Sequence, residues 1–131
     1  MINSCTGEVK LIDFGACMPF VQGELVDRFC GTPHFAAPEV LFQDYHRGWH
    51  QRSAQEVWSL GALLFVILFN TIPFEDDDAI LNMCINDKID NLANHVTISD
   101  DTIKLLNKML EKNPSKRLDI TEIRTMRYLS G

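Results

Sequence analysis

Residues 57–69 form a long apolar stretch that constrains the fold of this chain more than any other feature. Every residue in it is hydrophobic except Ser59 and Gly61. A helix without a polar face has to be buried, and 13 residues are too few to span a bilayer. Just before the stretch, Ser53 and Glu56 have the spacing of a capping box, in which Ser53 caps the helix. The sequence therefore predicts a buried central helix that begins after Ser53.

The remaining segments are also mostly helical. Residues 8–12 are the one candidate strand, closed by Asp13-Phe14-Gly15. The acidic run at residues 75–78 and Ser99 each precede a predicted helix, and a short helix is expected over residues 120–127. At 131 residues the chain fits one domain. We expect a mainly α fold, with a short β strand or hairpin at the N-terminus and a buried central helix.

Charge and cysteine content exclude several classes of function. The formal net charge is −6 and the pI is about 5.1, so the whole chain offers no basic face to nucleic acid. The excess of Lys and Arg in residues 104–131 is explained by a solvated helix face. The four cysteines form no C-x-x-C pair and no signal peptide precedes them, which favours reduced thiols. We expect a cytoplasmic and/or nuclear protein that binds neither nucleic acid nor membrane.

A set of short motifs occurs in an order and spacing that resemble a protein kinase. Asp13-Phe14-Gly15 follows the apolar strand, and Ala37-Pro38-Glu39 lies 24 positions later. Between and after them come Gly31-Thr32-Pro33, Val57-Trp58-Ser59-Leu60-Gly61, Ile72-Pro73-Phe74 and Asn113-Pro114-Ser115-Lys116-Arg117. The chain thus resembles the C-terminal lobe of a CAMK-like serine/threonine kinase. Some stretches are similar to Pim kinases and others to PAS kinases, and the motifs do not decide between them.

This resemblance implies roles for residues near the ATP and the substrate. Asp13 would be a magnesium ligand, and Phe14 and Gly15 would complete the cofactor-binding signature. Gly31-Thr32-Pro33 would form the substrate loop, in which the hydroxyl of Thr32 helps to position the catalytic aspartate. An alternative for Asp13 is that it serves only as a turn residue before Gly15.

Other residues of the motifs would be structural. Glu39 and Arg117 resemble a buried ion pair that fixes the end of the activation segment to the last helices, together with Ala37-Pro38. The alternative is two independent surface charges. Trp58 is expected in the core. Glu56 stands in the place of an aspartate that braces the catalytic loop, although its capping role explains it equally well.

Several kinase motifs do not occur in these residues. They contain no glycine-rich loop, no strand lysine with a partner glutamate and no His-Arg-Asp catalytic loop. We therefore expect residues 1–131 to be a partial kinase domain, running from just before Asp13-Phe14-Gly15 to the last helix. The N-lobe and catalytic loop would be absent, with the catalytic aspartate upstream and no catalytic residue within the chain.

Two functions remain as expectations. In the first, the chain is part of a non-specific serine/threonine protein kinase that transfers the ATP γ-phosphate to protein Ser or Thr, with Mg²⁺ as cofactor. The fragment alone would then be inactive. In the second, it is a non-catalytic kinase-like lobe, a pseudokinase or interaction module that binds protein partners.

Overall fold

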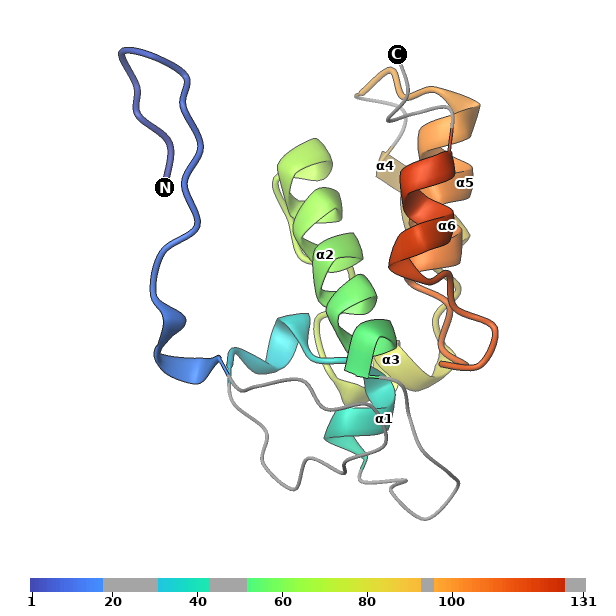
Figure 1. The fold of residues 1–131 in the computed structure, drawn as a ribbon. Coiled ribbons are helices and arrows are strands. Elements are labelled where there is room, and N and C mark those ends of the chain that lie inside the picture. Colours follow the sequence, from blue (N-terminus) through green and yellow to red (C-terminus); the bar gives the residue numbers. More distant parts are fainter. Residues whose placement is uncertain (18–30, 43–51, 93–95, 127–131) are drawn as a thin grey trace.

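The computed structural model describes residues 1–17, 31–42, 52–92 and 96–126. This part of the chain is mainly helical, as predicted (Figure 1). The regular elements run, in order, over Phe14–Ala16 (η1), Pro33–Phe35 (η2), Pro38–Leu41 (α1), Arg52–Phe69 (α2), Asp77–Asn82 (α3), Ile85–Leu92 (α4), Asp100–Met109 (α5) and Ile120–Thr125 (α6). η1 and η2 are single 3-10 turns. Figure 1 shows the N-terminal residues standing apart from the helices.

Helix α2 supplies much of the hydrophobic core. Its side chains Trp58, Ala62 and Phe65 are almost completely buried and pack in one cluster with Leu106 and Leu110 from the region of α5. Figure 1 shows α2 running beside α5 and α6. Burying each large side chain contributes roughly 1.5–3 kcal/mol. Among the helices that the structure describes, none has both the length and the hydropathy to cross a membrane.

One face of α2 is open to solvent, so the prediction of a helix buried on all sides is wrong. Leu60, Leu63 and Ile67 are exposed, Ile67 at 70% of its surface. With Glu56 one turn earlier, they follow helical spacing along one side; we call these four residues the α2 stripe. Hydrophobicity shows which side chains avoid water but not which neighbours cover them, and on this side no cover is present among the described residues.

The helix starts were predicted with mixed success. α2 begins at Arg52, so Ser53 lies inside its first turn and the predicted capping box at Ser53 is wrong. For α3 and α5 the predicted starts are confirmed. Asp76 caps α3 and Ser99 caps α5, and a side-chain oxygen of each accepts a hydrogen bond from a backbone N–H. A capping box does occur at α6, between Asp119 and Glu122.

The N-terminal arm, residues 1–17, is exposed along its whole length. An antiparallel bridge joins Ile2 to Val9, and Lys10 N–H donates to the Met1 carbonyl at 2.9 Å. Gly7 makes the turn with a φ of 71°. The predicted strand at residues 8–12 is thereby reduced to this bridge, because a two-stranded ribbon with nothing packed against it is marginal.

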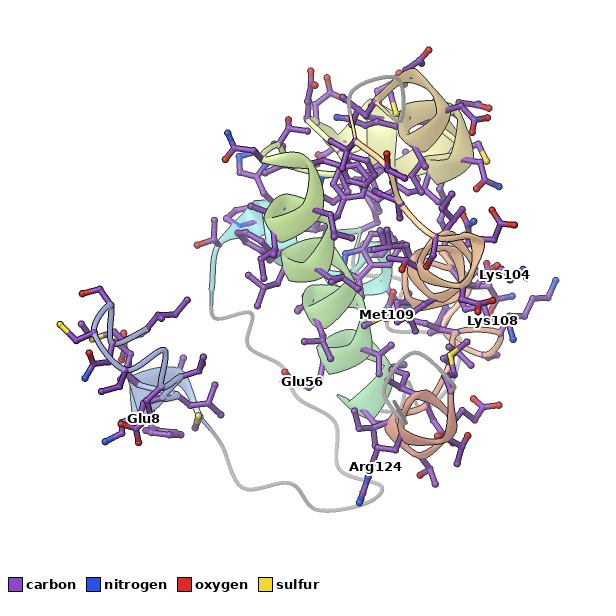
Figure 2. All side chains as sticks on the ribbon, turned by 90° about the horizontal axis from the view of Figure 1, so that it is seen from above. Glu8, Glu56, Lys104, Lys108, Met109 and Arg124 are labelled. Atoms are coloured by element: carbon purple, nitrogen blue, oxygen red, sulfur yellow. The ribbon has the colours of Figure 1, made fainter. Side chains whose placement is uncertain are left out.

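The prediction of a solvated basic face in the C-terminal region holds for α5 but not for Arg117, which is buried. Lys104 and Lys108 of α5 are exposed and point outward, on the side away from the N-terminal arm (Figure 2). Lys104 contacts Asp101 one turn earlier at 3.5 Å. Such exposed pairs add little stability.

Gly61 sets the distance between α2 and α5. A Cβ at this position would lie 2.9 Å from Met109 Cβ and 3.2 Å from Leu110 Cδ2. We expect Gly61→Ala to lower the free energy of unfolding by about 1–2 kcal/mol, because overpacking outweighs the gain in helix propensity. Denaturant unfolding followed by circular dichroism tests this. Leu60→Ala, next to it on the exposed side, is the control and should change stability by no more than about 0.5 kcal/mol. Equal effects of both variants would contradict the prediction.

The arm and the α2 stripe together expose many large apolar side chains, among them Leu11, Ile12 and Phe14. Exposed apolar surface of this kind promotes association. We expect the purified chain to form concentration-dependent oligomers, and we expect Leu63→Lys with Ile67→Lys to reduce them. Size-exclusion chromatography with light scattering measures both. A strictly monomeric sample with a sharp thermal transition would contradict this prediction.

Candidate functional site

Asp13 lies at the turn where the arm ends. It is the N-cap of η1, with φ 61° and ψ 75°, and its Oδ1 accepts the Gly15 N–H at 3.4 Å. A left-handed φ is uncommon for a residue other than glycine, although Asp adopts it more readily than most. The neighbouring Phe14 and Gly15 are exposed with it. The turn thus presents a carboxylate to solvent in a defined backbone conformation.

Asp13 could hold a divalent cation only as one ligand of several. Mg²⁺ in phosphoryl-transfer sites is bound by one or two carboxylates plus phosphate oxygens and water. Within the described ranges, no three His, Cys, Asp or Glu residues gather in a metal-binding group. Asp13 can therefore offer a cation one carboxylate, and other ligands have to come from outside the described residues.

The segment from Gly31 to Ala37 descends from solvent into the core. Gly31 has a φ of 132°, and Thr32 and Pro33 are exposed. The 3-10 turn η2 follows, and then Ala36 and Ala37 are buried at 6% and 1% exposure. The Thr32 side chain is exposed and makes no capping bond to η2.

The structure brings Glu39 and Arg117 together although 78 residues separate them. Arg117 Nη1 donates to Glu39 Oε1 at 2.6 Å, and Nη2 donates to Oε2 at 2.9 Å. The side chains are 4% and 0% exposed. This two-pronged geometry is the strong form of an Arg–carboxylate contact.

Arg117 also binds three main-chain carbonyls. Its guanidinium donates to the carbonyl oxygens of Ala54 at 2.8 Å, Glu111 at 2.8 Å and Lys112 at 3.3 Å. Its Cζ lies 5.0 Å from the ring centroid of Trp58, a cation–π distance. One side chain therefore joins α1, the first turn of α2 and the segment after α5.

We call the Glu39–Arg117 pair and the residues packed around it the anchor. Trp58, Ala37 and Pro38 also belong to it. Trp58 is 1% exposed and stacks on Phe74 with ring centroids 5.5 Å apart. Ala37 is the N-cap of α1, and Pro38 occupies the first turn, where its missing N–H costs nothing. The anchor is thus built on the buried side of α2.

Glu56 is separate from the anchor. It is exposed, and Figure 2 shows it on the side of α2 that faces the N-terminal arm, opposite Met109. Asp13 is also separate, because it lies within the exposed N-terminal arm. The predicted residues therefore fall into a buried anchor, an exposed loop around Thr32, and two isolated acids.

The sequence interpretation missed Ser59. Its Oγ donates to the carbonyl oxygen of Phe35 in η2 at 2.8 Å. The sequence signal that could have pointed to Ser59 was its hydroxyl side chain within an otherwise apolar stretch.

The site and fold define a helical lobe that carries kinase motifs, and comparison with known proteins agrees. The sequence model of the protein kinase domain matches residues 1–129. The chain belongs to the protein kinase domain family.

Several relatives of the chain are named as protein kinases. A probable serine/threonine-protein kinase MARK-A of Dictyostelium discoideum is 31% identical over 135 residues, covering 100% of this chain and 12% of the relative. Serine/threonine-protein kinase PEPKR2 of Arabidopsis thaliana is 32% identical over 126 residues, covering 94% and 26%. A cGMP-dependent protein kinase of Drosophila melanogaster, isozyme 2 forms cD5/T2, is 37% identical over 131 residues, covering 95% and 14%. The chain spans at most about a quarter of the length of these relatives.

Proposed function

We propose that this chain forms the substrate-binding part of a serine/threonine protein kinase that transfers the γ-phosphate of ATP to Ser or Thr in proteins. The carrying observation is the buried Glu39–Arg117 pair. It holds the chain directly after the Thr32 loop against the helical core. Phosphoryl transfer depends on positioning and electrostatics, so a rigidly anchored segment beside an exposed loop suits the docking of a protein substrate.

The roles proposed for individual residues come from the resemblance to kinases, and their exposed positions agree with these roles. Asp13 would hold the Mg²⁺ that accompanies ATP, and that ion would neutralise charge on the phosphates. Phe14 and Gly15 keep the turn that presents the carboxylate. Thr32, between Gly31 and Pro33, would orient the catalytic aspartate with its hydroxyl. Neither that aspartate nor an adenine site is found among the motifs of the 131 residues.

Location belongs to the same proposal. Cys5, Cys17 and Cys84 are free, exposed thiols. Exposed thiols persist in a reducing compartment, which supports a cytoplasmic or nuclear protein.

The transcript that encodes this chain provides the test. Sequencing it 5′ of the Met1 codon and expressing the longest in-frame product should reveal a His-Arg-Asp loop with a downstream asparagine. That product should label Ser and Thr in a peptide library with phosphate from Mg–ATP. A product that contains the loop and folds but transfers no phosphate would overturn the proposal.

A second candidate is a non-catalytic kinase-like lobe that binds protein partners. The exposed α2 stripe favours it, because contiguous apolar surface marks interaction sites. A stop codon directly before Met1, with an inactive folded product, would favour this candidate over the first.

A further inference from the structure

Ser59 uses its hydroxyl in an unusual way for a residue inside a helix. A helical serine commonly bonds the carbonyl four residues earlier or points to solvent. Here Ser59 Oγ donates at 2.8 Å to the Phe35 carbonyl, 24 residues away and partly buried. The bond therefore joins α2 to a separate segment and adds nothing to the helix itself.

The segment that receives this bond is internally rigid. Within η2 and its end, Phe35 N–H donates to the Thr32 carbonyl at 3.0 Å, and Ala36 N–H donates to Pro33 at 2.9 Å. These bonds make residues 32–36 one turn. α2 holds this turn through the packing of Phe35 against the core cluster and through the hydrogen bond to the Phe35 carbonyl. The bond to Ser59 is the directional contact of the two, and it therefore helps to fix the position of Thr32 relative to α2.

A second contact holds the chain just after this turn. Arg117 links Glu39, which follows the turn, to the Ala54 carbonyl in the first part of α2. Ser59 lies little more than one helical turn beyond Ala54. The Arg117 tie holds the buried end of the segment, whereas the Ser59 tie holds the end nearest to the exposed Thr32.

We propose that Ser59 is a positioning residue for the substrate loop: its bond to the Phe35 carbonyl fixes the exposed Thr32 hydroxyl relative to α2. This role rests on the proposed kinase function, because it matters only if residues 31–33 receive a substrate. Without the bond, the loop would occupy its binding-competent position for a smaller fraction of the time. The apparent affinity for the substrate would fall in proportion to the population of that position.

The first test needs no activity. In the 131-residue chain, Ser59→Ala should speed hydrogen exchange of the Phe35 and Ala36 amides by roughly 3- to 10-fold, the effect of losing one hydrogen bond. Ser59→Thr, which keeps the hydroxyl, should restore slow exchange. Ser53→Ala, on the same helix, is the matched control and should change neither amide. Unchanged exchange in Ser59→Ala, or equal acceleration in α5 and α6, would overturn the proposal.

The second test uses the longest in-frame product. Ser59→Ala should raise KM for the protein substrate roughly 3- to 10-fold and leave KM for ATP unchanged, and Ser59→Thr should restore the wild-type value. A rise in both KM values would overturn the positioning role. If the exchange result holds but the product has no kinase activity, the kinase function fails while the tie between α2 and η2 stands.

Discussion

Arg117→Ala is expected to lower the free energy of unfolding by about 3–5 kcal/mol, the usual cost of removing one partner from a buried ion pair. The carboxylate of Glu39 is 4% exposed and would remain buried without a counter-charge. The Ala54, Glu111 and Lys112 carbonyls would also lose a donor. Urea unfolding monitored by circular dichroism measures the loss.

Three variants separate the causes. Lys116→Ala removes a neighbouring exposed charge and should stay within about 0.5 kcal/mol of wild type. Arg117→Lys keeps the charge but not the planar fork, so it should fall between wild type and Arg117→Ala. Glu39→Met combined with Arg117→Met leaves no unpaired charge and should be more stable than Arg117→Ala alone. If Arg117→Ala unfolds no more easily than Lys116→Ala, the pair does not anchor the fold.

Local signals in the sequence predicted local structure well. Asp76 and Ser99 cap helices because a side-chain oxygen and a backbone N–H two or three residues ahead are enough to decide a helix start. The apolar run at residues 57–69 likewise predicted a helix. Ser53 is not the cap, because α2 already includes Arg52, one residue earlier.

Features that depend on distant contacts were harder to predict. The exposed α2 stripe could not be recognised, since Leu60 and Ile67 are as apolar as the buried Phe65. The strand at residues 8–12 shortened to one bridge because strand formation depends on a partner surface. For Glu39 and Arg117, no local rule joins residues 78 positions apart, and the expectation came from the resemblance to kinases. Ser59 was visible as a polar exception, but its partner Phe35 was not.

The 131-residue chain alone is expected to transfer no phosphate from ATP. Its motifs include one candidate metal ligand, Asp13, but no catalytic aspartate and no glycine-rich loop. Phosphoryl transfer gains nearly all of its rate from placing these groups together, so one carboxylate on an exposed arm should give no partial activity. The wild-type chain and the matched variant Asp13→Asn are each incubated with Mg²⁺, γ-labelled ATP and a Ser/Thr peptide library. Both should give the same background labelling.

Asp13 should become essential once those groups are present. In the longest in-frame product, Asp13→Asn keeps the size of the side chain and its bond to the Gly15 N–H but removes the charge. Loss of one preorganised electrostatic group typically costs about 10²–10³-fold in kcat, and we expect a fall of at least that size with little change in unfolding, because Asp13 is exposed. Magnesium titration should show a weaker dependence in the variant. Magnesium-dependent labelling by the 131-residue chain that disappears in Asp13→Asn would show that these residues already form a working phosphate-transfer site, and the assignment of Asp13 as one ligand among groups outside them would then be wrong.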